Sequence, residues 1–458
     1  MDLRTLVAVT VISLGTVSAY AAGSVRVWTS SQDLQCALTP GDALTFAPDQ
    51  ASDIVTFTIE PDKTYQTILG MGSSLEHTTC YNISLLDAAK QAEVIEKLFD
   101  PEKGIGMNLV RICIGTSDFA PLPYYSYDDM PEGETDPALE HFSIEKDRAY
   151  ILPVLKMALA QNPKLLFLAS PWSPPGWMKR GGGLCGGTLL EECYGVYAQY
   201  LAKFVKAYEA EGIPIHALTL QNEPGMVHKD YPTSLWNGDK QRDFIKNHLG
   251  PVFKEQGIAA KIWCFDHNFN NLKFPQAVLS DPDAAQYVDG TAFHFYEGKP
   301  EAMTELHEQF PDKHIYFTEG STFQTTGALK LMTFFRNWAE SYNSWVTVLD
   351  ENHGPNSGPH GASATCIMLD TAAKSLEYRF DYYMYGQFMK FIQRGAVRIA
   401  SNEGGRDLSN IAFKNPDGSI VTVVVNRRDK TEFKILCGGQ SVTTAIPAKS
   451  VATYVWTP

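Results

Sequence analysis

Two glutamates stand where apolar segments give way to polar loops. Glu223 ends the run His216–Glu223, and Glu319 ends the run His314–Glu319. Cleavage of a glycosidic bond needs one carboxyl group that protonates the leaving oxygen and an ionised one that meets the positive charge at the sugar carbon. The surroundings of two such carboxyls must separate their pKa values. Each glutamate alone could equally be a loop residue or an ion-pair partner, so the hypothesis requires one pocket that holds both.

Other apolar runs end in side chains that suit such a pair. Arg111 could lie beside an ionised carboxyl and favour its charged form. Asp118 follows in the next loop. The phenol of Tyr296 could orient a carboxylate through a hydrogen bond. Trp172 and Trp345 could stack on the apolar face of a sugar, although a tryptophan is more often a core residue.

Metal and serine chemistry are both disfavoured by the spacing of the candidate residues. The eight cysteines include no C-x-x-C pair, and no G-x-S-x-G segment is present. Cys185 and Cys193 are close enough in sequence for a local disulfide, which sequence alone does not establish. We therefore expect no metal and no cofactor. The histidines that could suggest a metal, but follow no zinc-ligand spacing, are His267, His294, His353 and His360.

The strand-like runs that would position these residues are eight in number, and helical patterns follow most of them. Several are almost continuous in Val, Ile, Leu and Phe, as strands covered on both faces should be. Asp147–Ala160 and Leu86–Phe99 have helical spacing, as does the stripe from Val196 to Tyr208. Eight strand–helix units predict an α/β fold, a (β/α)8 TIM barrel, whose site lies at the C-terminal strand ends. The runs are Tyr65–Gly72, Met107–Gly115, Leu165–Trp172, His216–Glu223, Lys261–Asp266, Gly290–Tyr296, His314–Glu319 and Ser344–Asp350.

Both ends of the chain follow a different pattern. Ile411–Phe413 and Ile420–Val425 flank the turn Asn415–Gly418, which predicts a hairpin. Ala43–Phe46 and Asp53–Ile59 also have the pattern of strands. We predict a small all-β sandwich built from both termini, with a separate C-terminal module as the alternative. The expected division is a signal peptide at 1–21, sandwich strands at 22–64, the barrel at 65–384 and the rest of the sandwich at 385–458.

Charge and the N-terminus bear on partners and location. The 458 residues carry a net charge of −14, which disfavours nucleic acid and anionic membranes as partners and suits a neutral substrate. Arg4, an apolar run and Ala19-Tyr20-Ala21 are typical of a cleavable signal peptide, which predicts a secreted or periplasmic protein. A buried N-terminal helix is the alternative. No other stretch is apolar enough for stable membrane insertion, and the sequence leaves the oligomeric state open.

The chain resembles glycoside hydrolase family 30, which includes the lysosomal glucosylceramidases. The resemblance rests on ordered motifs from about residue 65 to the end, in which Arg111 and Asp118 are seven residues apart. The other motifs are Ser-Pro-Trp-Ser-Pro-Pro-Gly-Trp-Met-Lys at 170–179, Gln-Asn-Glu-Pro at 221–224, Phe-Thr-Glu-Gly at 317–320, the region around Trp345 and Tyr383–Ile392.

The resemblance implies a retaining β-glycosidase with a role for each matching residue. Glu223 would be the general acid/base and Glu319 the nucleophile. Tyr296 and Arg111 would hold Glu319, and His294 would support the site. The residues that would bind the substrate are Asp118, Trp172, Asn222, Tyr296 and Trp345.

The sequence leaves two main alternatives for the identity of the substrate. The first is a β-glucoside such as glucosylceramide, so that the partner would be a carbohydrate or a glycolipid. The second is a β-1,6-glucan or a xylan cleaved internally by the same pair of glutamates. A carbohydrate-binding protein without catalysis is a remote alternative, because both carboxyls are present.

Overall fold

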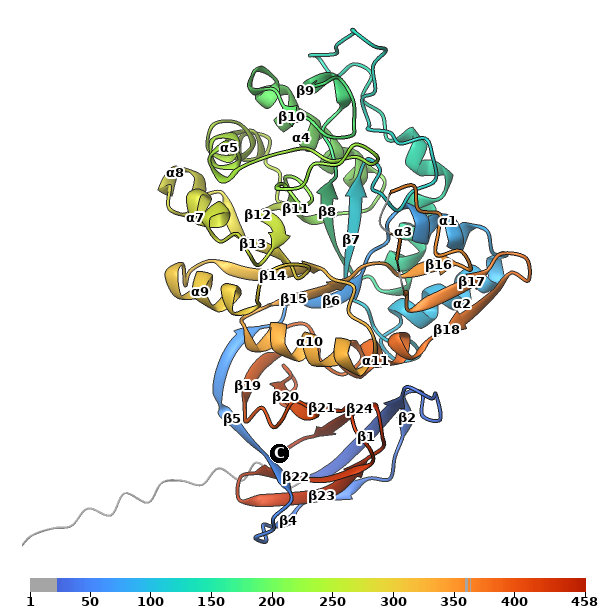
Figure 1. Ribbon diagram of the computed structural model, residues 1–458, viewed down its shortest axis with the longest axis vertical. Helices are drawn as coiled ribbons and strands as arrows, with labels where there is room; N and C mark the ends of the chain where they lie inside the picture. Colours follow the sequence, from blue (N-terminus) through green and yellow to red (C-terminus); the bar gives the residue numbers. More distant parts are fainter. Residues whose placement is uncertain (1–22, 359–360, 363) are drawn as a thin grey trace, which may run out of the picture.

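The computed structural model describes residues 23–358, 361–362 and 364–458. The predicted signal peptide and His360 lie outside these residues. Figure 1 shows a strand-and-helix body above a smaller body made only of strands. Within the described part of the chain, every helix is too short or too polar to serve as a membrane span.

The upper body is the predicted (β/α)8 barrel. Six parallel strands form one continuous sheet and two further parallel strands form another. Bridges between Ser74 and Arg111 and between Gly320 and Ser344 join the two sheets and close the barrel. The interior is filled by side chains from successive strands, among them Leu168, Trp263 and Tyr316. The barrel strands are β6 (Gly70–Ser73), β7 (Leu109–Ile114), β8 (Leu166–Pro171), β11 (Ile215–Thr219), β12 (Lys261–Asn268), β13 (Val288–His294), β14 (His314–Glu319) and β15 (Ser341–Ser344).

The first and last barrel strands differ from the prediction. Tyr65–Thr67 belong to the long strand β5 (Val55–Thr67) of the lower body, and the barrel strand begins only at Gly70. At the other end the barrel strand precedes Trp345, and the apolar residues after it form β16 (Val348–Asp350). This strand pairs with β17 (Ile367–Asp370), which pairs with β18 (Ser375–Tyr378). The apolar run led to a wrong position for the last barrel strand, because residues buried against α1 are as apolar as residues buried in a barrel strand.

Helices surround the barrel, and most begin after the polar loops that follow the C-terminal strand ends. The expected helical segments are confirmed, although Asp147 lies in a 3-10 turn before its helix. A short antiparallel pair, β9 (Lys179–Arg180) and β10 (Thr188–Leu189), lies in the loop after β8. The helices are α1 (His77–Ser84), α2 (Ala88–Phe99), α3 (Ile151–Gln161), α4 (Tyr194–Ala210), α5 (Gly238–Phe244), α6 (Gly250–Glu255), α7 (Lys273–Leu279), α8 (Pro282–Ala285), α9 (Glu301–Gln309), α10 (Gln324–Arg336) and α11 (Phe380–Met389).

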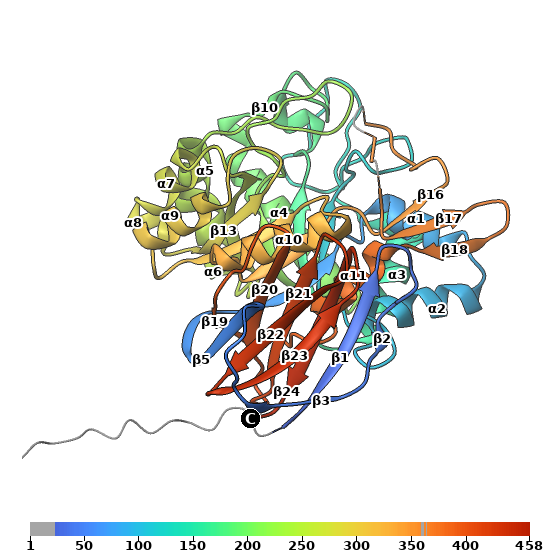
Figure 2. The same cartoon turned by 60° about the horizontal axis from the view of Figure 1, so that its bottom comes forward.

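The lower body is the predicted β-sandwich, and both termini contribute to it. β1, from the N-terminal end, pairs antiparallel with β24, the last strand (Figure 2). The predicted hairpin is confirmed by the pairing of β20 with β21. The remaining sandwich strands join the same hydrogen-bonded sheet as β5. The strands are β1 (Ser24–Ser31), β2 (Thr39–Pro40), β3 (Leu44–Thr45), β4 (Ala47–Pro48), β19 (Val397–Ser401), β20 (Leu408–Lys414), β21 (Ile420–Asn426), β22 (Thr431–Cys437), β23 (Gln440–Ile446) and β24 (Ser450–Trp456).

The sandwich packs against α10 and α11 on the outside of the barrel. The guanidinium of Arg394 donates to the backbone carbonyls of Leu69, Asn108 and Lys164, which lie at the starts of barrel strands. α11 contacts both bodies, so the predicted boundary at residue 384 falls within a helix that they share and stays a prediction. The C-terminal strand ends are therefore left open to substrate.

Candidate active site

One cavity at the C-terminal ends of the barrel strands contains both glutamates. Glu319 is the last residue of β14, and Glu223 lies in the loop after β11 with a φ of 47°. A positive φ is costly for a residue other than glycine, and such conformations cluster at functional sites. The cavity has a volume of about 340 Å³. Its walls include Asp118, Phe119, Glu223, Met226, Tyr231, Asn268, Tyr296, Glu297, Glu319, Ser321 and Trp345.

The two carboxyl groups are close enough to act on one bond. His294 Nδ1 lies 3.1 Å from Glu223 Oε1 and 3.9 Å from Glu319 Oε1. The two oxygens therefore lie no more than about 7 Å apart. Glycosidases that retain the anomeric configuration place their two carboxyl groups about 5–5.5 Å apart, and those that invert it leave ~6.5–9.5 Å between them. This limit is compatible with the retaining arrangement.

Arg111 fixes the position of Glu319 from below the cavity. Its Nη1 donates to Glu319 Oε2, and its Nη2 donates to Asn222 Oδ1 and to Asp266 Oδ2, each at 2.8 Å. Burial acts to lower the pKa of the guanidinium, but the charges of Asp266 and Glu319 outweigh it and raise that pKa. The hydroxyl of Tyr296 donates to Glu319 Oε1 at 2.9 Å. Both oxygens of Glu319 thus accept hydrogen bonds, which hold the carboxylate in one orientation.

Asp266 organises the floor of the site, although the sequence did not single it out. Its Oδ2 accepts from Arg111, Ser170 and Thr219, and its Oδ1 accepts from Thr318. Burial acts to raise the pKa of this carboxyl, but the charges of Arg111 and His294 hold the pKa far below its usual range. Asp266 is therefore an anion in a fully buried network.

A bulge in β12 turns Asp266 into the barrel. Phe265 pairs with Ala292 and His267 pairs with Phe293, so Asp266 is the extra residue. Phe265 and Asp266 have φ values of 73° and 75°. Strict alternation after Trp263, which points inward, would have placed Phe265 inside and Asp266 outside. The bulge reverses that order, and no turn residue in the sequence marks it.

Replacing Asp266 by Asn should destabilise the whole protein. In the variant the buried charge of Arg111 loses one of its two carboxylate partners. The amide N–H groups of the new side chain also face hydrogen-bond donors from which the carboxylate of Asp266 had accepted. We expect a loss of about 3–5 kcal/mol in unfolding free energy, the usual cost of breaking a buried ion pair. Urea unfolding at pH 7 measures it. The control is Asp407→Asn, which removes the partner of the exposed Arg428 and should cost under about 1 kcal/mol. Equal stability of the two variants would contradict the role given to Asp266.

His294 lies between Glu223 and Asp266 and links the two carboxylates. Its Nε2 is 3.0 Å from Asp266 Oδ1, on the other side of the ring from Glu223. Burial acts to lower the pKa of the imidazole, but the charges of Glu319 and Asp266 outweigh burial and raise that pKa to about 9. One proton is therefore held between Glu223 and His294 at neutral pH.

The surroundings give the carboxyls of the cavity different proton affinities. Burial raises the pKa of Glu319, and the charges of His294 and Arg111 oppose the rise. Burial acts in the same direction on Glu223, but the hydrogen bond and charge of His294 prevail and lower its pKa. Burial, followed by the charge of Glu319, raises the pKa of Asp118 to about 8. The carboxyl of Asp118 is therefore largely protonated at pH 7 and can donate a hydrogen bond. Its contact with a sugar stays a prediction.

The predicted tryptophans lie side by side at the wall. Trp345 lines the cavity, and the ring of Trp172 stacks on it with centroids 5.2 Å apart. Trp172 is only 2% exposed, and the Arg111 guanidinium lies 4.8 Å from its ring centroid. Trp172 therefore supports the ring of Trp345, and the contact of Trp172 with a sugar stays a prediction. The predicted contact between Asn222 and a sugar hydroxyl also stays a prediction.

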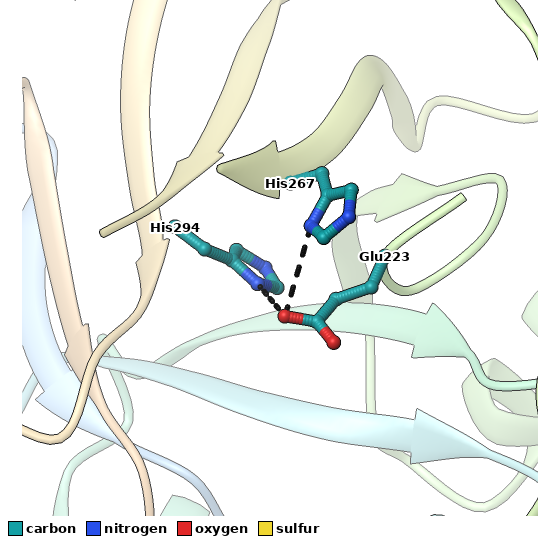
Figure 3. A group of neighbouring side chains, drawn as sticks. All are labelled: Glu223, His267 and His294. Carbon is teal, nitrogen blue, oxygen red and sulfur yellow. Dashed lines mark hydrogen bonds and ion pairs between the residues drawn. The ribbon is translucent and has the colours of Figure 1, made fainter. Parts of the chain in front are cut away.

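His267 adds a third ligand-type side chain next to Glu223. Its Nδ1 lies 3.7 Å from Glu223 Oε1. Figure 3 shows the rings of His267 and His294 both facing the carboxylate of Glu223. One ligand atom from each of the three lies within 4.8 Å of the other two. The spacing of these residues in the sequence follows no metal motif, because they come from the ends of three different strands.

Comparisons with known proteins agree with this fold. Two family models match, the glycosyl hydrolase family 30 TIM-barrel domain at residues 68–392 and the glycosyl hydrolase family 30 beta sandwich domain at 395–454. The chain is 34% identical over 389 residues to an endo-1,6-β-D-glucanase of Neurospora crassa, covering 80% of each protein. It is 30% identical to the lysosomal acid glucosylceramidase of Mus musculus, covering 87% of this chain and 83% of that one. A solved endo-β1,6-glucanase structure aligns with a TM-score of 0.86 and 31% identity, covering 95% of this chain and 99% of the other.

Proposed function

Because the chain belongs to glycoside hydrolase family 30 and is a glycosyl hydrolase, we propose that it cleaves β-D-glucosidic bonds by double displacement, with Glu319 as nucleophile and Glu223 as acid/base. The observation that carries the proposal is the position of His294, whose Nδ1 is within 4 Å of an oxygen of each glutamate. Two carboxyls at that spacing can act on opposite sides of one sugar carbon.

In the first step Glu319 attacks the anomeric carbon while the glycosidic bond breaks. Tyr296 and Arg111 hold the attacking carboxylate in place. Glu223 gives a proton to the leaving oxygen, so the aglycone departs as an alcohol. In the second step Glu223 removes a proton from water, and the water oxygen attacks the same carbon. Glu319 then leaves as a carboxylate, and the sugar regains its original configuration.

His294 holds the proton that Glu223 donates. The 3.1 Å contact between His294 Nδ1 and Glu223 Oε1 lets the proton pass from the ring to the carboxyl. Asp266 holds the opposite ring nitrogen and fixes the orientation of the ring. The pair keeps its proton below the raised pKa of His294 and loses it as the pH rises through that value.

His294→Asn should move the basic limb of the pH profile. In the wild type, kcat/KM should fall as the pH rises through about 9, the pKa of His294. Without the imidazole, the carboxyl of Glu223 alone holds the proton and loses it at lower pH, so the limb moves toward acid. We expect kcat/KM at pH 7 to fall about 10²-fold, the lower range for general acid–base catalysis. The control is His314→Asn, because His314 begins β14 and lies at the opposite end of that strand from Glu319. A limb unchanged by His294→Asn would rule out the shared proton.

The relatives favour β-1,6-glucan as the glucoside. The endo-1,6-β-D-glucanase of Neurospora crassa and the solved endo-β1,6-glucanase support this substrate at 34% and 31% identity. Glucosylceramide is the second candidate, supported by the murine glucosylceramidase at 30% identity.

One screen tests both the substrate and the stereochemistry. The purified protein is incubated with β-1,6-glucan, glucosylceramide, an aryl β-glucoside and an aryl β-xyloside, and NMR follows the anomer of the first product. We expect oligosaccharides from β-1,6-glucan and a β-anomer as the first product. Glucose as the main product, with rapid cleavage of glucosylceramide, would favour the second candidate. An α-anomer as the first product would refute double displacement.

Export would place the protein where such glucans occur. We propose that residues 1–21 are a signal peptide and that the chain is secreted or periplasmic. N-terminal sequencing of the protein from culture medium or periplasm should then give Ala22 as the first residue. An intact Met1 would contradict export by this route.

A further inference from the structure

Glu223, His267 and His294 together have the arrangement of a metal-binding set. Both histidines approach the same oxygen, Glu223 Oε1, at 3.7 Å and 3.1 Å (Figure 3). Tetrahedral zinc holds nitrogen and oxygen ligands at about 2.0–2.1 Å, so neighbouring ligand atoms lie about 3.4 Å apart. The two contacts lie on either side of that distance. The third edge, between the two histidines, is at most 4.8 Å, and a small rotation of His267 would close it.

The histidines are already oriented for such a ligand. Nδ1 of His267 is buried and has no hydrogen-bond partner. A buried ring nitrogen normally has a partner, so this atom is available to a ligand. Nε2 of His294 is 3.0 Å from the carboxylate of Asp266. A carboxylate on the far nitrogen of a metal-binding histidine is the usual support that fixes its ring and raises its basicity.

The charges around the three side chains also favour a divalent cation. The carboxyls of Glu223, Asp266 and Glu319 are opposed by the buried guanidinium of Arg111 and by the proton that Glu223 shares with His294. Zinc bound at Nδ1 of His294 would displace that proton and bring one more positive charge than it removes. Arg111 contacts Glu319 and Asp266 and gives no hydrogen bond to Glu223. The carboxylate nearest to both histidines is therefore the one that the guanidinium neutralises least. A bound dication would balance the excess negative charge.

We propose that Glu223, His267 and His294 form a reversible zinc site and that zinc bound there stops hydrolysis. Two imidazoles and one carboxylate, with a fourth position open, form a ligand set of zinc. Mg²⁺ and Ca²⁺ prefer oxygen ligands and should not compete. The inhibition rests on the proposed acid/base role of Glu223, because the ion would occupy the oxygen that exchanges the proton. The binding itself does not depend on that role.

Calorimetry with ZnCl2 tests the binding directly. The full chain, freed of metal with EDTA, should bind one zinc ion that Mg²⁺ at millimolar concentration does not displace. Co²⁺ should give the visible absorption of a tetrahedral site. His267→Asn and His267→Gln should each raise the dissociation constant at least about tenfold, since even the loss of an outer-shell partner costs about 10–100-fold in affinity. Two variants are used so that a folding defect in one leaves the other informative.

His141→Asn is the matched control. His141 forms a histidine–carboxylate pair with Asp136 that is exposed at the histidine. The His141→Asn variant should leave zinc affinity and zinc inhibition unchanged. Zinc bound by the free cysteines would be lost in none of these variants, so the dependence on His267 separates the site from them. Equal zinc affinity in the wild type and both His267 variants, or no binding by the wild type, would overturn the zinc site. Zinc binding that depends on His267 without loss of hydrolysis would support the site and overturn the acid/base role of Glu223.

Discussion

Glu319→Gln should reduce kcat/KM on an aryl β-glucoside by at least about 10⁴-fold, the order of loss that follows removal of a covalent nucleophile. The amide has nearly the shape of the carboxylate but carries no charge, so it cannot form the glycosyl-enzyme. Arg111 keeps its contacts with Asp266 and Asn222, and the fold should therefore survive. Steady-state kinetics measures the loss, and thermal unfolding monitors the fold.

A matched control for this variant is Glu340→Gln. Glu340 contacts His314 at the start of β14, at the opposite end of the strand from Glu319. Its replacement should leave kcat/KM close to the wild-type value. A 2-deoxy-2-fluoro glucoside offers a direct readout, because mass spectrometry of the trapped enzyme should locate the label on the peptide that contains Glu319. A label on another peptide, or near-normal turnover by Glu319→Gln, would falsify the nucleophile assignment.

The barrel could be predicted because strands that are covered on both faces leave short apolar runs. Met107–Gly115 and Leu165–Trp172 contain β7 and β8 for this reason. The two closing strands could not be placed in the same way. β15 consists of Ser341-Tyr-Asn-Ser, whose polar side chains bond to neighbouring strands. The apolar residues after it are buried against a helix instead, and periodicity does not distinguish the two environments.

The site was predictable where the chemistry depends on a strand end. Glu223 and Glu319 follow apolar runs, and the geometry of a parallel barrel brings such ends together. Asp266 also ends an apolar run, Lys261–Asp266, but strict alternation along that run would have turned its side chain out of the barrel. Only the bulge in β12 brings it inward. His267 was noticed only as a histidine without a metal motif. Its relation to Glu223 exists in space and leaves no spacing in the sequence.

Glu223→Ala should separate the two roles of its carboxyl. On β-1,6-glucan, whose leaving group needs a proton, we expect a loss of about 10²–10⁴-fold, the usual contribution of general acid–base catalysis. On a dinitrophenyl β-glucoside the leaving group departs without a proton, so the first step should proceed. The glycosyl-enzyme should then accumulate as a burst of dinitrophenol, because no base activates the water.

Azide should rescue the second step, and the configuration of its product should identify the role of the glutamate that was removed. It needs no general base and fits the space left by the side chain of Glu223. Attack on the α-linked glycosyl-enzyme places azide on the β face, so NMR should detect β-glucosyl azide. If Glu223 were the nucleophile instead, its removal would let azide displace the leaving group directly and would give the α-azide. The configuration of one product thus decides which of two buried carboxyls, within about 7 Å of each other, forms the covalent bond.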